Sequence, residues 1–256
     1  MKIAIIGAGN MGAAITRGLM RGVHNQEWEV AVANPHENKL RVLQTEWPQL
    51  HTYTNNWEAA LDAQVIILAV EPDRVADAYD QVAPQPGQLV VSIAARFGLD
   101  RLEELMGSDV PLFRAMPNTP IAVGEGMTLI ASRHASPEDE RLVLSVFREA
   151  GGAMLLPESQ LEAGMVLASC GVAYTMKYVQ AMIQGGIELG LTPQVAMRLT
   201  AQALIGSGRL LLDDETHPAI ELERVTTPGG VTIKGVNELD HAGFASAVLR
   251  AVKAAK

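Results

Sequence analysis

The chain opens on the apolar run Ile3-Ala4-Ile5-Ile6, which is followed at once by Gly7-Ala8-Gly9-Asn10-Met11-Gly12. Four apolar residues in a row predict a buried parallel strand, and residues 13–20 have the composition of a helix. The glycines therefore stand between a strand and a helix, as in a dinucleotide-binding turn. Gly7 permits the tight turn, Gly9 leaves room for a pyrophosphate, and Gly12 allows close helix packing. A plain structural corner is the competing interpretation.

Further apolar runs follow at residues 28–33, 65–70, 89–94, 112–114, 127–130 and 153–156. They alternate with stretches of helical character, which predicts an α/β fold with a doubly wound parallel sheet of Rossmann type over residues 1–156. From Pro157 onward, apolar residues recur at spacings of three and four, so residues 157–256 are expected to form an all-helical domain. Met176, Met182 and Met197 have this spacing and are assigned to its core.

Composition narrows the function classes. The 256 residues carry a formal net charge of −9 and one cysteine, Cys170, which we interpret as a packed thiol. Nucleic acid is not an expected partner, because such binding needs clustered Lys and Arg. No stretch approaches the ~20 uncharged apolar residues of a membrane span, so no membrane partner is expected. The lone cysteine favours a cytoplasmic location. The six scattered histidines lack metal-ligand spacing, so no metal site is predicted.

The end of the second predicted strand bears on cofactor choice. NAD-selective sites place an Asp or Glu there, whereas this chain has Asn34, followed by His36 and Lys39. The missing carboxylate favours NADP(H) over NAD(H). An asparagine at a strand end is also a good turn residue, and this alternative stays open.

A second glycine-rich segment lies near the C-terminus, where Pro228-Gly229-Gly230 precedes a predicted helix and lies between Thr227 and Thr232. Free N–H groups at a helix start, with two hydroxyls beside them, are suited to bind a carboxylate. A tight interhelical turn capped by threonine explains the same residues equally well.

Three separated segments carry a family resemblance. The opening IAIIGAGNMGAAITRGL, the loop RAMPNTPIAVGEGMT at residues 114–128 and PAIELERVTTPGGVTIKGVNELD at residues 218–240 resemble pyrroline-5-carboxylate reductases. The resemblance implies a Rossmann domain followed by a helical dimerisation domain. It also implies NAD(P)H-dependent reduction of 1-pyrroline-5-carboxylate, a cyclic imine, to L-proline by a homodimer or a ring of dimers.

The resemblance also assigns residues. Cofactor contacts fall on Gly7 to Gly12, Asn34, Asn56, Ala69, Val70, Pro72, Met116, Pro117, Asn118 and Thr119. Substrate contacts fall on Thr227, Gly229, Gly230, Val231 and Thr232. Thr232 stands at the position of the substrate-contacting threonine and is the candidate catalytic residue. We expect the amides of Gly230 and Val231 to hold the substrate carboxylate.

Some residues depart from the family pattern. Glu71 replaces a more usual lysine, Val172 stands in a segment that differs from the usual one, and Thr227 and Val231 replace a more usual Ser and Thr. Two alternatives therefore stay open: a reductase of another cyclic imine or small keto acid, and a nucleotide-binding regulatory homologue without turnover.

Overall fold

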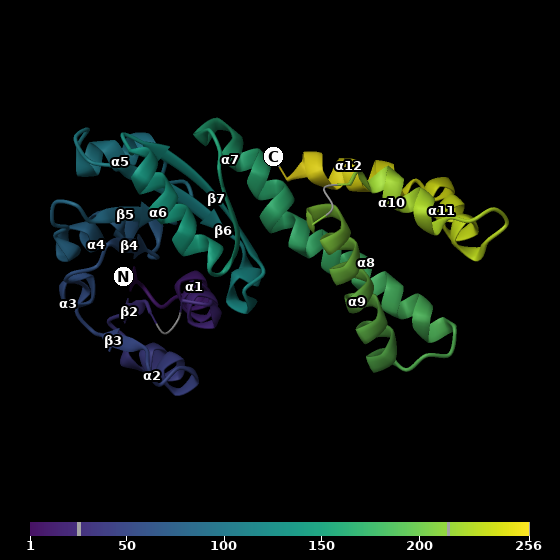
Figure 1. Cartoon of the computed structure of the whole chain (residues 1–256), viewed down its shortest axis with the longest axis horizontal. Coiled ribbons are helices and arrows are strands. Elements are labelled where there is room, and N and C mark those ends of the chain that lie inside the picture. Colours follow the sequence, from purple (N-terminus) through teal and green to yellow (C-terminus); the bar gives the residue numbers. More distant parts are fainter. Residues whose placement is uncertain (25–26, 214–215, 256) are drawn as a thin grey trace. The chain divides into compact units, whose positions relative to one another are not determined.

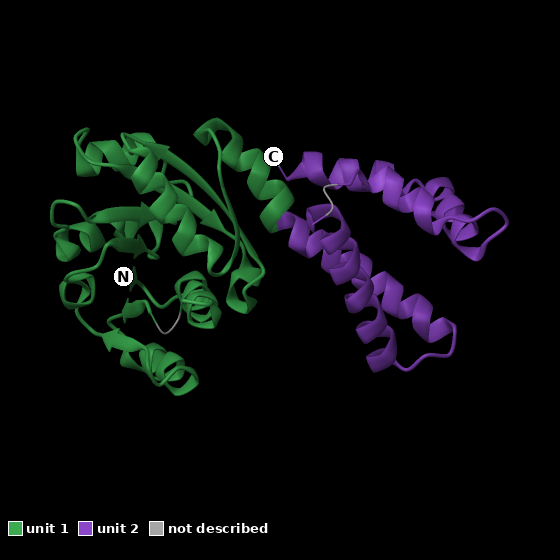
Figure 2. Ribbon diagram, in the orientation of Figure 1, with its two compact units in different colours: residues 1–169 green, residues 170–256 purple. Residues whose placement is uncertain are grey.

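The computed structural model describes residues 1–24, 27–213 and 216–255 (Figure 1). The chain divides into two compact units, which we call the α/β unit, residues 1–169, and the helical unit, residues 170–256 (Figure 2).

An eight-stranded sheet forms the centre of the α/β unit. Its strands are β1 (Lys2–Ile6), β2 (Glu29–Ala33), β3 (His51–Tyr53), β4 (Val65–Leu68), β5 (Leu89–Ser92), β6 (Leu112–Pro117), β7 (Gly126–Arg133) and β8 (Gly151–Leu155). They lie in the order β3-β2-β1-β4-β5-β6-β7-β8, and β1 to β6 are parallel. The first six strands thus have the Rossmann order, with the switch point between β1 and β4, and the predicted fold class is confirmed.

The last two strands run the other way. β7 pairs antiparallel with β6, and β8 pairs parallel with β7. Only the short helix η2 (Thr119–Val123) separates β6 from β7, and a parallel return needs a crossover of a dozen or more residues. The chain therefore doubles back, so the parallel arrangement expected from the sequence holds for six strands of the eight.

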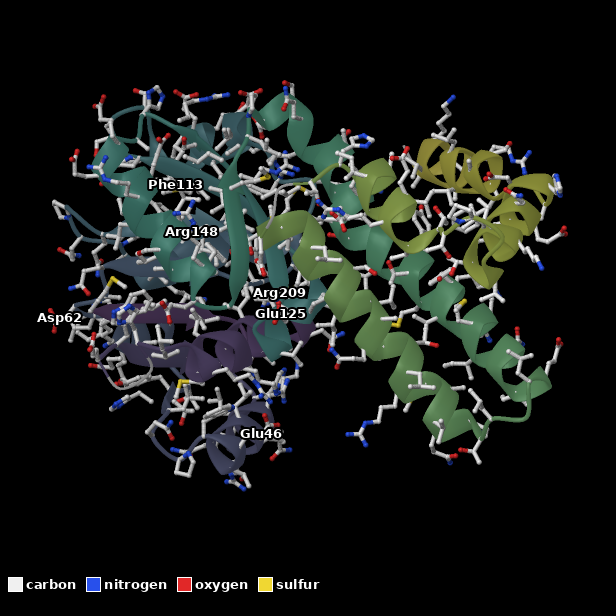
Figure 3. The ribbon with its side chains drawn as sticks, turned by 45° about the vertical axis from the view of Figure 1, so that its right-hand side comes forward. Glu46, Asp62, Phe113, Glu125, Arg148 and Arg209 are labelled. Atoms are coloured by element: carbon white, nitrogen blue, oxygen red, sulfur yellow. The ribbon has the colours of Figure 1, made fainter. Side chains whose placement is uncertain are left out.

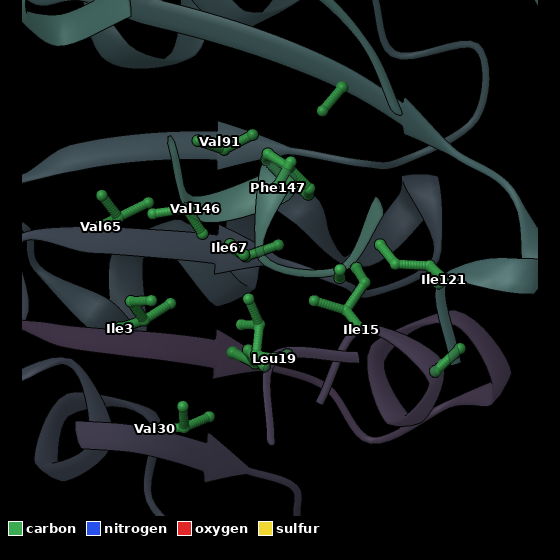
Figure 4. Close-up of a cluster of buried hydrophobic side chains, with 14 of the residues drawn as sticks. Ile3, Ile15, Leu19, Val30, Val65, Ile67, Val91, Ile121, Val146 and Phe147 are labelled. Atoms are coloured by element: carbon green, nitrogen blue, oxygen red, sulfur yellow. The ribbon is translucent and has the colours of Figure 1, made fainter. Parts of the chain in front are cut away.

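Helices cover both faces of the sheet. The core on one face includes side chains from α1 (Asn10–Arg21), α2 (Glu37–Glu46) and α6 (Pro137–Arg148). The core on the other face includes side chains from α3 (Asn56–Ala60), α4 (Val75–Val82), α5 (Leu99–Met106) and α7 (Glu158–Met165). Figure 4 shows the first core, where Ile3 and Ile67 lie near Ile15, Leu19 and Phe147. Burial on both faces explains why these strands are continuously apolar.

Helix α7 packs within the α/β unit, and a helical domain that starts at residue 157 stays a prediction. Leu161 is fully buried in the second core, and Gly164 lies so close to Leu129 of β7 that a Cβ would stand 2.5 Å from its side chain. A π-helical turn, η3 (Val166–Cys170), then leads into α8. The division into compact units thus falls after residue 169.

The helical unit consists of α8 (Gly171–Glu188), α9 (Pro193–Asp213), α10 (Pro218–Val225), α11 (Val231–His241) and α12 (Phe244–Ala254). Gly186 of α8 lies against Ala196 of α9, which leaves no space for a side chain between them. The Tyr174 hydroxyl donates to the Ala251 carbonyl at 3.2 Å and ties α12 to α8.

The assignment of three methionines to the core is wrong for the single chain. Met176 is 61% exposed, and Met182 and Met197 are exposed as well. Met176 and Met182 lie on α8 and Met197 lies on α9, and the contacts within the single chain leave all three side chains exposed. Large exposed apolar surfaces mark interaction sites.

Candidate functional site: a dinucleotide cleft and a glycine-rich helix start

The three glycines of the first turn have different surroundings. Gly7 has a φ of +110°, and its N–H donates to the Ala33 carbonyl of β2 at 2.8 Å. A Cβ on Gly12 would stand 1.9 Å from the Gly7 carbonyl oxygen, so strand and helix touch there. A Cβ on Gly9 would meet no atom within 4 Å. Gly9 therefore faces open space at the head of α1, as a pyrophosphate site requires.

The N-terminus of α1 is free to bind an anion. Gly9 is its N-cap and supplies no side-chain cap. The N–H groups of Asn10, Met11 and Gly12 begin the helix and have no intrahelical acceptor, and the helix dipole adds a partial positive charge. These residues fit the phosphates of a dinucleotide.

Asn34 holds the glycine turn from the end of β2. Its Oδ1 accepts from the Ala8 N–H at 3.1 Å, and its Nδ2 donates to the His36 carbonyl at 3.2 Å. The side chain is buried. The structure therefore brings Asn34 to the turn and uses its amide within the protein; a direct contact with the adenosine stays a prediction.

A cavity of about 320 Å³ lies beside this turn, between α1 and α2. It is lined by Ala8, Gly9, Asn10, Ala13, Arg17, Lys39, Val42 and Leu43. Two hydrogen bonds of 2.7 and 2.8 Å pair Arg17 with Glu46 and lower the pKa of the Glu46 carboxyl; Figure 3 labels Glu46 on α2. Lys39 has no ion-pair partner among the residues that the structure describes. The cavity thus presents one cation without a counterion.

The residues after β4 lie against the glycine turn. The Ala69 N–H donates to the Ile6 carbonyl at 2.8 Å, and the Ala69 carbonyl is 2.4 Å from where a Cβ of Gly7 would stand. Val70 is the next contact of that position, at 3.2 Å. Pro72 begins the short helix η1 (Pro72–Arg74), with Glu71 exposed before it.

Asn56 begins α3, and its Nδ2 donates to Gln81 Oε1 at 2.8 Å. The structure places it in the segment after β3, but no bond connects it with the glycine turn, so its role as a cofactor contact stays a prediction.

The segment Met116–Thr119 spans the end of β6 and the start of η2. Met116 and Thr119 are accessible, whereas Pro117 and Asn118 are buried. Since β1, β2, β4 and β6 are parallel strands of one sheet, their carboxyl ends share an edge. The structure thus gathers the segments after these strands on the edge where dinucleotides bind.

The glycine-rich segment of the helical unit connects α10 with α11. Gly229 has a φ of +73°, and the Gly230 N–H donates to the Thr227 carbonyl at 3.0 Å. Gly230 is the N-cap of α11 and supplies no side-chain cap, while Val231 is 83% exposed and Thr232 is exposed. The amide of Gly230 is thus engaged, which corrects the expectation that it holds a carboxylate. The N–H groups of Val231 and Thr232 are the first free ones.

Within residues 1–24, 27–213 and 216–255, no group of three or more His, Cys, Asp or Glu side chains is placed to hold a metal ion. The same residues include no helix with the length and apolarity that a membrane crossing requires.

Comparisons with known proteins agree with this geometry. The family described as pyrroline-5-carboxylate reductase dimerisation matches residues 158–256, and the family described as NADP oxidoreductase, coenzyme F420-dependent, matches residues 2–96. A pyrroline-5-carboxylate reductase of Synechocystis is 36% identical, covering all of this chain and 96% of the relative. One of Dictyostelium discoideum is 30% identical over 98% of this chain, which spans 48% of that relative's length.

Solved structures show the same fold over the whole chain. A pyrroline-5-carboxylate reductase from Coxiella burnetii has a TM-score of 0.88 and 28% identity, covering 99% of this chain and 95% of the other. A pyrroline carboxylate reductase from Plasmodium falciparum, solved with NADP bound, has a TM-score of 0.81 and 25% identity, covering 100% and 95%.

A Rossmann sheet with an open glycine turn, followed by a helical dimerisation domain, defines a dinucleotide-dependent oxidoreductase. Identity of 36% over the full length of a relative narrows this class further. The chain belongs to the pyrroline-5-carboxylate reductase family.

Proposed function

We propose that the protein reduces 1-pyrroline-5-carboxylate to L-proline with NAD(P)H. The observation that carries this proposal is that two helices of a chain of this family begin without a side-chain cap. Helix α1 follows Gly9, which faces open space, and helix α11 follows Pro228-Gly229-Gly230. The first suits the cofactor phosphates and the second suits the substrate carboxylate.

The substrate's carboxylate binds at the start of α11. The free N–H groups of Val231 and Thr232 lie in the first turn of α11, a helix of eleven residues. The Thr232 hydroxyl belongs to the same turn and contacts the carboxylate or the ring nitrogen. The helix dipole contributes roughly 0.3–1 kcal/mol to this contact. Most of the rate enhancement must therefore come from orienting the ring.

The segment from Thr227 to Thr232 contains no acid or base, and the reaction does not need one there. The bound cofactor supplies the hydride. A cyclic imine takes its proton from water before it binds, so its acceptor carbon is already electrophilic. The protein's part is to hold the carboxylate and to position the ring.

A variant of Thr232 tests the substrate site. Thr232→Ala removes the hydroxyl and keeps the backbone, so kcat/KM for 1-pyrroline-5-carboxylate should fall roughly 10- to 100-fold. The dissociation constant of NADPH, measured by fluorescence titration, should stay the same. Thr226→Ala is the matched control, because the Thr226 hydroxyl donates to the Leu222 carbonyl at 2.9 Å and is already engaged. Equal kinetics for Thr232→Ala and wild type would remove the hydroxyl from the mechanism.

NADP(H) is the preferred cofactor in this proposal. Asn34 stands where NAD-selective sites have a carboxylate, and Lys39 lines the adjoining cavity as an unneutralised cation that suits a 2′-phosphate. The nearby Glu37 is paired with Arg41 at 2.9 Å, which reduces its repulsion of a phosphate.

A substitution at Lys39 tests this preference. Lys39→Gln should lower kcat/KM for NADPH roughly five- to tenfold and leave that for NADH unchanged. Arg141→Gln is the control and should change neither, because Arg141 lies on α6, is paired with Glu138 and does not line the cavity. A wild-type protein that prefers NADH, or a Lys39 variant with an unaltered ratio, would exclude this 2′-phosphate site.

Dimers form through the helical unit in this proposal, either as a homodimer or as a ring of dimers. The match of residues 158–256 to a dimerisation family and the exposed apolar side chains of α8 and α9 support it.

A further inference from the structure

Asn118 is a buried amide that joins three segments of the α/β unit. It is 6% exposed. Its Oδ1 accepts from the Met127 N–H of β7 at 2.8 Å, and its Nδ2 donates to the Ala168 carbonyl of η3 at 2.8 Å. The residue itself follows β6 directly and is the N-cap of η2. Both polar ends of the side chain are therefore engaged with protein, and the side chain is not free to bind the cofactor.

The two bonds demand an amide. Met127 requires an acceptor and Ala168 requires a donor, and the asparagine side chain presents one of each in a single plane. An ionised aspartate keeps the acceptor but sets a negative oxygen against the Ala168 carbonyl. A protonated aspartate has the same size and the same donor and acceptor as asparagine. The site thus discriminates between two protonation states of one side chain.

The position of these bonds relates them to the reaction. The family resemblance implies that residues 116–119 contact the nicotinamide side of the cofactor, and Asn118 ties this segment to β7 and the π-helical turn. Its anchor, Ala168, belongs to a π-helical turn, and such turns occur frequently at functional sites. The turn ends at Cys170, and α8 begins at the next residue.

We propose that Asn118 is a positioning residue for hydride transfer, which fixes the backbone of residues 116–119 against β7 and the π-helical turn before the cofactor binds. This inference rests on the proposed reductase function. In this inference the Asn118 side chain holds residues 116–119 in place, and the neighbouring backbone contacts the cofactor. A displacement of about 1 Å at such a segment lowers the rate about 100-fold without removing any binding group.

Three variants test the inference. Asn118→Ala removes both bonds, and Asn118→Asp changes one of them at constant size. Gln88→Ala is the matched control, because the Gln88 amide donates to the Ala60 and Ala63 carbonyls at 2.9 and 2.7 Å and accepts from the Gln85 N–H, all remote from the carboxyl edge of the sheet.

For Asn118→Ala we expect kcat to fall 10- to 100-fold, with KM for the imine and the NADPH dissociation constant within about threefold of wild type. The primary isotope effect with deuterated NADPH should rise, because hydride transfer becomes more rate-limiting. Gln88→Ala should lower the melting temperature by a comparable amount and leave kcat within twofold. Equal losses of kcat in the two alanine variants would reduce Asn118 to a structural amide and overturn the inference.

For Asn118→Asp we expect activity relative to wild type to recover as the pH falls, since the protonated carboxyl can again donate to Ala168. The titratable side chains on the adjoining segments are Arg114 on β6, Glu125 before β7, Arg133 on β7 and Cys170 on η3. The helices packed against η2 and β7 add Arg17 and Arg21 on α1 and Glu158 and Glu162 on α7. They are common to wild type and variant, so the ratio at each pH isolates residue 118. A ratio that does not change with pH would contradict the role of the donor.

Amide hydrogen exchange without cofactor gives a readout that does not need turnover. Asn118→Ala should speed exchange in residues 115–119 and 166–171, whereas Gln88→Ala should not. Wild-type exchange rates in both segments of Asn118→Ala would overturn the inference. A wild-type protein without any turnover of 1-pyrroline-5-carboxylate would contradict the proposed function instead.

Discussion

Gly9 and Gly12 stand three residues apart in the same turn, yet a side chain would have opposite effects at the two positions. Gly9→Val places its side chain in open space, so the fold should lose only about 1 kcal/mol, as for other N-cap replacements, while NADPH binding should weaken more than 100-fold. Gly12→Ala drives a Cβ into the Gly7 carbonyl and should destabilise the fold by about 2–3 kcal/mol. Urea unfolding and fluorescence titration separate the effects. Normal NADPH binding by Gly9→Val would contradict the assignment of the turn to the cofactor.

Single residues differ in how far the sequence reveals them. Spacing between a strand and a helix was enough to assign roles to Gly7, Gly9 and Gly12, because these roles depend on local backbone geometry. The bonds of Asn34 to Ala8 and of Asn118 to Ala168 join residues 26 and 50 positions apart. No local sequence pattern encodes such a pair, so these two hydrogen-bonding roles could be identified only from the folded structure.

At the scale of elements, one carboxylate attaches α7 to the sheet. Glu158 Oε1 accepts from the Leu99 N–H at the start of α5 at 2.8 Å and from Arg114 Nη1 on β6 at 3.0 Å. Arg114 is buried, so Glu158→Gln leaves a guanidinium without its counterion. Because Glu158 is partly exposed, we expect a loss of about 2 kcal/mol in the free energy of unfolding, below the 3–5 kcal/mol of fully buried pairs.

Urea denaturation of Glu158→Gln measures this loss. Glu162→Gln, an exposed position on the same helix, is the control and should change stability by less than about 0.5 kcal/mol. The same small change for Glu158→Gln would show that α7 is held by apolar packing alone.

Most elements followed from their apolar runs, since strands buried on both faces must be apolar throughout. β3 (His51–Tyr53) was missed because it is a short, polar strand at the sheet edge. Strand β7 runs antiparallel to β6 because the connection between them is too short for a crossover. The only sign of this in the sequence is the small number of residues between the two apolar runs. The π-helical turn at Val166–Cys170 has no composition of its own, so periodicity could not separate it from the helices around it.

At the scale of the whole molecule, the apolar surface of the helical unit predicts self-association. Met176 in α8 and Leu199 in α9 are each about 60% exposed in the single chain. We expect sedimentation velocity to show a dimer or a larger even-numbered assembly, and Met176→Glu to shift it toward the monomer, because a buried charge without a partner is costly. Val23→Glu, an exposed apolar position of the α/β unit, should leave the assembly intact. A monomeric wild type at micromolar concentration would contradict this account.

The two-domain organisation was predictable because the periodicity changes once, near residue 157. The exposure of the methionines was not predictable. Helical spacing indicates which residues share a face, but it does not indicate whether that face packs against the same chain or against another. Substrate identity has the same limit: Thr227 and Val231 depart from the family pattern in a segment that is exposed in the single chain.

The measurement that tests the central claim most directly is the oxidation of NADPH by the purified protein with 1-pyrroline-5-carboxylate, followed by loss of NADPH absorbance and by chromatographic identification of the product. We predict multiple turnovers and one L-proline formed for each NADPH oxidised. The reaction with piperideine carboxylate, the corresponding six-membered cyclic imine, should be slower. Binding of NADPH without oxidation, or turnover only with the six-membered imine or a keto acid, would contradict the proposed function.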